Sequence, residues 1–425
     1  MKYANELIKF IKKSPTAYHT VEIVRAALTR AGYTEISESD TAAFSDGGKH
    51  FVVRGGTSLI AFRGTGDGFM ICSTHSDSPS FKLKGEADGV YARYATEPYG
   101  GMIYYSWLDR PLSLAGRVVV RTETGISTRL INIDKNILTI PSVAIHLNRT
   151  VNEGAKLNPA QDLLPLAGTA ASKGALMQTV ADAAGVNVAD IITHDLYLYN
   201  REEGKIVGIS DELILSPRLD DLECVYASVD AFLGTRGNCG SIGVLAIFDN
   251  EEVGSSTKQG ANSTFLDMTL SHIAGSDDRY TAMLQNSFMV SADNAHASHP
   301  NHPELSDPKN APRLSEGVVV KYNANQRYAT DALSDAIFRT LATRSGARLQ
   351  SYTNRADMPG GSTLGSICNT RVSIPTVDIG LPQLAMHSAT ETAAVSDLAD
   401  LVKVLKELYS TLIRVNGESV DIIKG

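Results

Sequence analysis

Acidic residues crowd the end of an apolar run that is typical of a buried strand. Residues 241–247, SIGVLAI, lead into the segment FDNEEVGS, which places Asp249, Glu251 and Glu252 within four positions. Like charges so close to a core repel one another and resist the loss of water. The segment therefore predicts a positive charge beside these carboxylates.

Acids and histidines also follow other apolar runs of the chain. In open α/β sheets, ligands bind beyond the carboxyl ends of the strands, so these side chains should meet at one edge. His75 and Asp77 follow the apolar run 68–74. Asp293, His296 and His299 follow the run 287–292, and His387 follows the run 374–380. The acidic pair Asp220 and Asp221 lies in the segment SPRLDDLE. Imidazole and carboxylate are natural ligands of zinc and, to a lesser degree, of manganese or cobalt. A divalent metal is the predicted counter-charge.

This set of side chains is larger than one ion requires, because a catalytic zinc takes about three protein ligands and a water. Two ions ~3.5–4 Å apart, bridged by one carboxylate, would use them all and would share a hydroxide. Zinc lowers the pKa of its bound water to ~7, which allows this ionisation. A carboxylate left free of the metals, within the pair Glu251 and Glu252, could serve as general base.

Each candidate also has an ordinary structural interpretation. A lone histidine at a strand end is more often hydrogen-bonded than bound to metal, and a Glu-Glu pair is usually a solvated turn. Asp220 and Asp293 could be N-caps of helices. Their coincidence at one edge favours the metal interpretation. The chain contains no HExxH, GxSxG or GxxxxGK[ST] motif that would indicate another chemistry.

Composition and charge exclude several classes of protein. The chain of 425 residues is 43% hydrophobic and 20% charged, which is ordinary for a globular protein. A net charge of −8 argues against a nucleic-acid partner. The four cysteines form no CxxC pair, and the first twenty residues lack the apolar core of a signal peptide. With no apolar stretch long enough to span a bilayer, we expect a cytoplasmic protein without a membrane partner.

The elements that must position these residues alternate between helix and strand at both ends of the chain. Helices are predicted at 3–13, 18–31, 221–234, 263–275, 330–346 and 396–413, the last with an apolar stripe that extends to Leu412. Strands are predicted within 50–64 and at 68–74, 241–247, 287–293 and 374–381. In residues 84–208, stretches of aromatic and β-branched residues alternate with turn residues, which predicts mainly strands, with one helix at 173–184. We therefore predict a three-layer α/β/α catalytic domain, formed by 1–83 and 209–425, that a β-rich domain over 84–208 interrupts.

The order of eight motifs resembles that of the M18 metallo-aminopeptidases, the aspartyl aminopeptidase family. The motifs are SPTAYHTV, THSDSP, SPRLDDL, DNEEVGS, SADNAHASHP, KYNANQRYATDA, DMPGGSTLG and PQLAMHS. The resemblance covers essentially the whole chain. It implies an exopeptidase with two zinc ions, whose β-rich insertion is a dimerisation domain. It also implies that dimers build a tetrahedral dodecamer that encloses the active sites.

The resemblance assigns a metal to each candidate ligand. His75 and Asp293 would hold one zinc ion, with Asp220 as the bridge. Glu252 and His387 would hold the other ion, with the same bridge. These assignments follow from matching the family's motifs position by position.

The resemblance also implies roles around the metals. Glu251 looks like the general base, and Asp77 resembles the acid that orients the histidine ligand His75. His146, in IPSVAIHLNR, would reach into the active site of a neighbouring subunit and stabilise the tetrahedral intermediate. From the residues alone, His146 is more simply a buried histidine on a strand.

Substrate contacts are implied at two places. Lys321 resembles the residue that faces an acidic side chain of the substrate, although a surface lysine is the ordinary alternative. Gly361, Ser362 and Thr363 resemble the loop that lines the substrate pocket, where glycine permits a close backbone approach.

The sequence departs from the family pattern at four positions. Ser76 replaces the usual threonine, and Asp221 replaces the usual asparagine beside the bridge, where an extra acid could alter metal affinity. Ala17 and Tyr18 replace proline and phenylalanine near the expected pocket entrance. These last two changes bear on substrate preference.

The sequence as a whole predicts a metal-dependent aminopeptidase that removes one residue from short peptides, with acidic residues as the first choice of substrate. A preference for neutral or basic residues is the nearest alternative. An amidohydrolase acting on N-acylated amino acids would use the same architecture. A catalytically silent oligomeric scaffold is the remaining alternative, although a scaffold has no need of Glu251.

Overall fold

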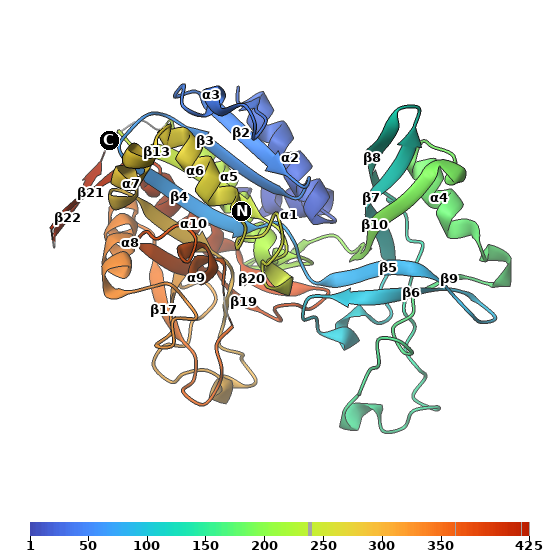
Figure 1. Cartoon of the computed structure of the whole chain (residues 1–425). Helices are drawn as coiled ribbons and strands as arrows, with labels where there is room; N and C mark the ends of the chain where they lie inside the picture. Colours follow the sequence, from blue (N-terminus) through green and yellow to red (C-terminus); the bar gives the residue numbers. More distant parts are fainter. Residues whose placement is uncertain (237–239, 362, 418, 425) are drawn as a thin grey trace.

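A nine-stranded sheet lies at the centre of the larger of two lobes in the computed structural model, which describes residues 1–236, 240–361, 363–417 and 419–424 (Figure 1). Its strand order is β1-β2-β3-β13-β4-β14-β18-β16-β17. The strands are β1 (Thr34–Glu35), β2 (Lys49–Arg54), β3 (Ser58–Arg63), β4 (Phe69–His75), β13 (Ile242–Phe248), β14 (Phe288–Ala292), β16 (Val318–Tyr322), β17 (Leu349–Thr353) and β18 (Thr376–Gly380). The central strands β13, β4, β14 and β18 run parallel. These strands are buried on both faces, which explains why their sequences are continuous apolar runs.

Helices cover both faces of this sheet. One group is α1 (Lys2–Lys13), α2 (Ala17–Arg30), α5 (Leu219–Gly234), α8 (Ala332–Ser345) and α10 (Val395–Leu408), which share one apolar cluster. The other is α3 (Thr41–Phe44), α6 (Phe265–Ala274), α7 (Asp277–Gln285) and α9 (Leu364–Asn369), in a second cluster. Along β4, Met70 and Cys72 belong to the first cluster and Phe69 and Ile71 to the second. Because successive side chains of a strand point to opposite faces, the predicted three-layer α/β/α architecture is confirmed.

The smaller lobe is built on a separate six-stranded sheet with the order β8-β7-β10-β5-β6-β9 (Figure 1). Its strands are β5 (Ser80–Ala87), β6 (Ala92–Tyr99), β7 (Leu112–Thr122), β8 (Gly125–Asn132), β9 (Leu166–Gly168) and β10 (Ile191–Asn200). Helix α4 (Ala175–Ala184) packs on this sheet through Leu176 and Val180, in a core that includes Phe81 and Trp107. The sheet occupies the segment for which a β-rich domain is predicted, although β5 already begins at Ser80.

A five-stranded sheet and a hairpin complete the fold. The sheet has the order β11-β12-β20-β19-β15, with β11 (Lys205–Val207), β12 (Leu213–Ser216), β15 (Ala295–His296), β19 (Pro382–Leu384) and β20 (Glu391–Ala394). The hairpin pairs β21 (Thr411–Asn416) with β22 (Ser419–Lys424). In the described part of the chain, no helix is both long enough and apolar enough to cross a membrane.

The last helix ends earlier than the sequence predicted. A helix to residue 413 was expected, whereas α10 ends at Leu408 and Leu412 lies on β21. The apolar pattern continues across this boundary, and periodicity alone does not separate the two elements. The β-branched residues Thr411, Ile413 and Val415 favour a strand, which explains the change.

Candidate metal centre

The carboxyl ends of the parallel strands bring the predicted residues to one edge of the large sheet. His75 is the last residue of β4 and pairs with Phe248 at the end of β13, which η5 (Glu251–Val253) follows. Asp293 comes directly after β14. These positions follow from the parallel direction of the strands, as expected for a ligand site in an open α/β sheet.

One group of side chains surrounds His75. Ligand atoms of His75, Asp220, Asp221 and Asp293 all lie within 4.8 Å of one another. The Nε2 atom of His75 is 3.5 Å from Oδ1 of Asp220 and 3.6 Å from Oδ1 of Asp293. Asp221 also accepts a hydrogen bond from the backbone N–H of His75 at 3.2 Å. This group could hold one metal ion.

A second group surrounds His387 and shares Asp220 with the first. It contains Asp220, Glu252 and His387, with ligand atoms again within 4.8 Å of one another. The Nε2 atom of His387 is 3.4 Å from Oδ2 of Asp220 and 3.3 Å from Oε2 of Glu252. Asp220 therefore turns one carboxylate oxygen toward each histidine, which is the geometry of a carboxylate that bridges two ions.

The burial of these acids supports a bound cation. Asp220 is 3% exposed, and the side chain of Glu252 is equally buried. Among the described residues, Oδ1 of Asp220, Oδ1 of Asp221 and Oε1 of Glu252 have no hydrogen-bond partner. Leaving buried carboxylate oxygens unpaired costs several kcal/mol each. A divalent ion bound by imidazole and carboxylate removes this cost, so the donor set fits zinc.

The pKa shifts of these side chains also support a positive charge at the site. Burial raises the pKa of Glu252 well above its usual range, and repulsion by Asp220 adds to the effect. Burial acts to raise the pKa of Asp220, but its close contacts with the imidazoles of His387 and His75 outweigh burial and lower the pKa. Burial acts to lower the pKa of His387, but the hydrogen bond to Asp220 and the charge of Glu252 raise it to about 10. Protons here supply positive charge that a divalent ion can replace.

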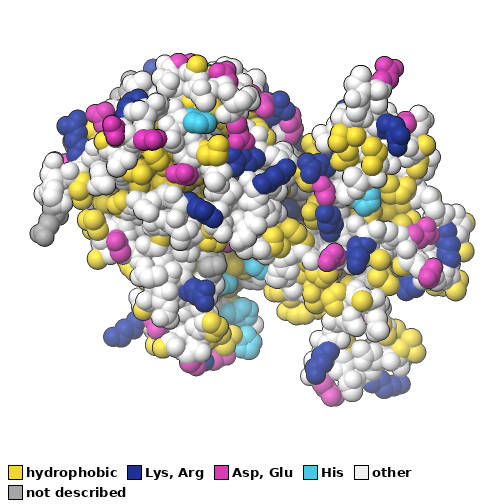
Figure 2. All heavy atoms as spheres, in the orientation of Figure 1, with side chains coloured by type: hydrophobic (Ala, Val, Ile, Leu, Met, Phe, Trp, Pro, Cys, Tyr) yellow, Lys and Arg dark blue, Asp and Glu magenta, His cyan; other side chains and the backbone are white. Residues whose placement is uncertain are grey.

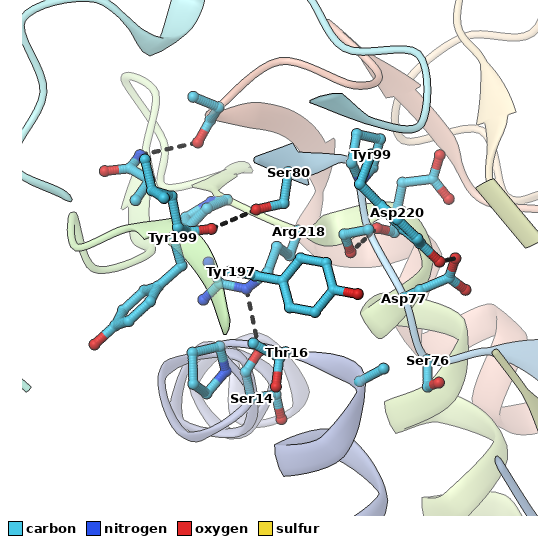
Figure 3. Close-up of a pocket in the computed structure, with 18 of the residues that line it drawn as sticks. Ser14, Thr16, Ser76, Asp77, Ser80, Tyr99, Tyr197, Tyr199, Arg218 and Asp220 are labelled. Atoms are coloured by element: carbon cyan, nitrogen blue, oxygen red, sulfur yellow. Dashed lines mark hydrogen bonds between the residues drawn. The ribbon is translucent and has the colours of Figure 1, made fainter. Parts of the chain in front are cut away.

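Asp77 lies beside His75. Its backbone carbonyl is 3.1 Å from Nδ1 of His75, and its Oδ1 atom is 3.4 Å from the same nitrogen. Its carboxylate also accepts hydrogen bonds from the backbone N–H groups of Glu251 and Glu252, each at 3.2 Å, and from the hydroxyl of Tyr99 at 2.6 Å (Figure 3). Asp77 therefore ties the imidazole of one ligand group to the segment that carries the second.

Three contributors to the site were not foreseen from the sequence. Tyr99, at the end of β6, holds Asp77, and the carbonyl of Gly101 faces Nδ1 of His387 at 2.6 Å. Glu391, on β20, accepts hydrogen bonds from the backbone N–H groups of His387 at 2.7 Å and Asp220 at 3.1 Å. None of the three follows an apolar run of the large sheet. The signal in the sequence is the Tyr-Gly-Gly segment, since a Cβ on Gly100 would lie 3.2 Å from Cβ of Glu252.

A pocket opens beside the two ligand groups, and it contains most of the predicted substrate contacts. It is lined by Asp220, Glu251, Asp293, Asn294, Ala295, His296, Lys321, Tyr328, Tyr352, Gly361, Thr363, Met386 and His387. Burial raises the pKa of Glu251 to about 8, and repulsion by nearby acids adds to the effect of burial. Ser362, predicted to lie on the same loop, falls outside the described residues.

Lys321 is buried rather than exposed. It is 3% exposed, and its Nζ lies 3.2 Å from Oδ2 of Asp293. Its Nζ also lies 5.7 Å from the centre of the Tyr328 ring. The alternative of a surface lysine is therefore wrong, and the ammonium group forms part of the pocket wall.

Two other candidate residues belong to neither ligand group. Asp249 is buried and accepts hydrogen bonds from the backbone of Asn250 and the side chain of Gln259. His299 is exposed, with its ring 5.3 Å from that of His302. Neither residue lines the pocket beside the metal ligands, whereas His296 does.

His146 and the Ala17–Tyr18 pair do not line the pocket beside the two ligand groups of their own chain. His146 is exposed on a loop between β8 and β9, so the alternative of a buried histidine on a strand is wrong. It does not line its own chain's pocket. Ala17 and Tyr18, expected near the pocket entrance, line a different hollow between the lobes (Figure 3). The start of α2 packs against the small lobe there, through a hydrogen bond from Tyr18 to Asp195 at 3.2 Å.

The sequence as a whole is similar to one family of proteins. Residues 10–409 match the model of the aminopeptidase I zinc metalloproteases (M18). A probable M18 family aminopeptidase 2 of Clostridium novyi (strain NT) is 41% identical over 430 residues, which cover 96% of this chain and 99% of the relative. A protein of the same description from Clostridium acetobutylicum is 42% identical, with the same coverage.

Solved structures of related proteins share the fold. The structure of a complex of Ape4 and Nbr1 superposes with a TM-score of 0.92 at 32% identity, over 96% of this chain and 85% of the other. A structure of the S. cerevisiae mApe1 dodecamer gives a TM-score of 0.84 at 28% identity, over 96% of both chains.

The shared position of Asp220 predicts the metal content of variants. We expect Asp220→Ala to lose both ions, because its two oxygens face both ligand groups, whereas His387→Ala should lose only the ion of the second group. Elemental analysis of the dialysed proteins checks this, with the exposed Asp278→Ala as a control that keeps full content. Undiminished metal in the Asp220 variant would show that this carboxylate does not bridge.

Proposed function

This chain belongs to the M18 family of zinc metalloproteases and is a metal-dependent aminopeptidase, and we propose that it removes acidic residues from short peptides at a centre of two zinc ions. Asp220, which turns one oxygen toward each histidine, is the observation that carries the two-ion centre. In this proposal His75 and Asp293 hold one ion, and Glu252 and His387 hold the other. Manganese or cobalt could replace zinc on the same ligands.

Bound zinc supplies Lewis acidity, which polarises the scissile carbonyl and makes water a stronger acid. The residues of the chain supply the remaining chemistry. Glu251 lines the pocket but belongs to neither ligand group. The positive charge of bound zinc would favour its carboxylate form, which could then accept a proton from the attacking water. The same carboxyl group then delivers the proton to the departing amine. Asp77 keeps the imidazole of His75 in the orientation that ligation requires.

The pocket wall supports a preference for acidic residues. Lys321 is the only lysine or arginine among the described residues that line the pocket, and it is buried there. A buried ammonium group favours a carboxylate on the substrate, because their attraction is weakly screened. Tyr328, Tyr352 and Met386 also line the pocket, and these favour a neutral side chain as the second candidate.

A neighbouring subunit is proposed to complete the site. His146 lies on a loop that extends from the small lobe (Figure 1), and Val143, Ile145 and Leu147 beside it are 56%, 47% and 84% exposed. Figure 2 shows hydrophobic side chains on this part of the small lobe. Exposed apolar side chains grouped in this way support a partner surface on the loop. Because a relative forms a dodecamer, we propose a homo-oligomer in which dimers are the building block and a tetrahedral dodecamer is the complete assembly.

Substrate preference is tested with fluorogenic aminoacyl substrates and a Lys321→Met variant. We expect aspartyl and glutamyl substrates to be cleaved best, and the variant to lose about 10- to 150-fold in kcat/KM on these substrates only, the value of one charge-assisted hydrogen bond. Leucyl substrates serve as the internal control. A preference for leucine would support the neutral alternative, and cleavage of N-acylated amino acids would support the amidohydrolase.

The role of Glu251 predicts a separation of turnover from metal binding. Glu251→Gln keeps the shape of the side chain but removes the base, so kcat should fall by about 10²- to 10⁴-fold. Zinc content and oligomer size should match those of the unaltered protein. Normal turnover in this variant would mean that another group moves the proton.

Active-site sharing predicts complementation between two inactive variants. His146→Ala should lower kcat by about 10²- to 10³-fold if the imidazole stabilises the oxyanion in a partner's site. Subunits of this variant, mixed and reassembled with Glu251→Gln subunits, should regain activity, because some sites then contain both residues. The exposed His302→Ala is the matched control for loss of a surface histidine. Mixed oligomers without recovered activity would exclude sharing through His146.

A further inference from the structure

Glu391 lies between the two chain segments that carry Asp220 and His387 of the second ligand group. It is the first residue of β20, the strand that β12 and β19 flank in the five-stranded sheet. Ser216, at the end of β12, pairs with Glu391, and Leu384, at the end of β19, pairs with the next residue of β20. The chain reaches Asp220 soon after β12 and His387 soon after β19. Both ligands therefore leave the sheet beside Glu391.

Neighbouring groups hold the backbone and the Nδ1 atom of His387. Its backbone N–H donates to Oε1 of Glu391 at 2.7 Å, and its carbonyl accepts from the N–H of Ile103 at 3.0 Å. Its Nδ1 lies 2.6 Å from the carbonyl oxygen of Gly101. The φ angle of His387 is 67°, which is uncommon for a residue other than glycine and persists only where the surroundings hold it. These contacts leave Nε2 to face the other ligands of the group.

Asp220 is held at its backbone in a similar way. Its angles of φ −79° and ψ 112° are not helical, although α5 begins one residue earlier. Its N–H donates to Oε2 of Glu391 at 3.1 Å, and its carbonyl accepts from the hydroxyl of Ser78 at 2.7 Å. The carboxylate of Glu391 thus accepts hydrogen bonds from the backbones of two ligands, with one oxygen for each.

The separation between the side chains of these ligands suits a bound zinc ion. Zinc lies ~2.0–2.2 Å from its nitrogen and oxygen ligands, so two ligand atoms of a tetrahedral ion are ~3.4 Å apart. Nε2 of His387 lies 3.4 Å from Oδ2 of Asp220 and 3.3 Å from Oε2 of Glu252. A shift of either backbone would change this spacing. Groups that orient metal ligands typically contribute about 10- to 100-fold to metal affinity.

We propose that Glu391 is a positioning residue for the second ion, because its carboxylate fixes the backbone of His387 relative to that of Asp220. This inference rests on the proposed centre of two ions. The role requires two acceptor oxygens, since both partners are N–H donors. A glutamine would turn its NH2 group toward one of them, and an aspartate is one methylene too short to reach both. Glu391 is 2% exposed, so bulk water is poorly placed to replace a lost hydrogen bond.

Two substitutions at Glu391 test this role through zinc affinity. Metal-free oligomers are dialysed against buffers of fixed free zinc, and the bound ions are counted by elemental analysis. In both Glu391→Gln and Glu391→Asp, we expect one ion to bind as in the unaltered protein and the other to require about 10- to 100-fold more free zinc. An anomalous difference map at intermediate zinc should show that the weakened peak is the one beside His387. The aspartate keeps the negative charge, so its loss of affinity separates reach from charge, and this milder variant carries the test if the glutamine variant does not assemble.

Glu223→Gln is the matched control for loss of a buried carboxylate. Glu223 is fully buried on α5, but among the described residues it accepts no hydrogen bond from the backbone of a ligand. This variant should bind both ions as the unaltered protein does. Unchanged zinc binding in the Glu391 variants would overturn the inference, even if the metal-free oligomer unfolded at a lower temperature, because Glu391 would then be merely structural. An unaltered protein that binds only one ion would contradict the two-ion centre, and the inference with it.

Discussion

A buried carboxylate shared between two histidines is the constraint on which the rest of the structure depends. Asp220 directs Oδ1 toward His75 and Oδ2 toward His387, and almost none of its surface reaches solvent. Further acids crowd the same space, so the group carries more negative charge than its histidines can balance. We propose that divalent cations neutralise this excess and also supply the Lewis acidity that peptide hydrolysis requires. In this proposal the same cations explain both the burial of the acids and the catalysis.

The two lobes cooperate in holding this group in place. The large sheet supplies the candidate ligands His75 and Asp293 from the ends of its parallel strands, and His387 comes from the loop after β19 of the five-stranded sheet. The small lobe supports both histidines from behind, since Tyr99 holds the acid that faces His75 and the carbonyl of Gly101 faces His387. The geometry of the metal ligands thus depends on the contact between the lobes. The hollow lined by Ala17 and Tyr18 lies within that contact, next to Tyr99.

Much of the fold and the grouping of the candidate ligands could be predicted from the sequence, because both rest on local patterns. Apolar runs identified the central strands, and the rule that ligands gather at carboxyl ends selected His75, Asp293 and His387. Contacts between distant elements were beyond this reasoning. Glu391 reaches the site from the five-stranded sheet, and Ala17 belongs to the contact between the lobes rather than to the pocket entrance. Periodicity also failed where apolar residues continue from α10 into β21.

The central claim is that two metal ions share the carboxylate of Asp220. An anomalous difference map, collected at the zinc edge from crystals grown with zinc, tests it most directly. The account predicts two peaks ~3.5–4 Å apart, one beside each oxygen of Asp220. A single peak, or two peaks that do not both contact this carboxylate, would contradict it.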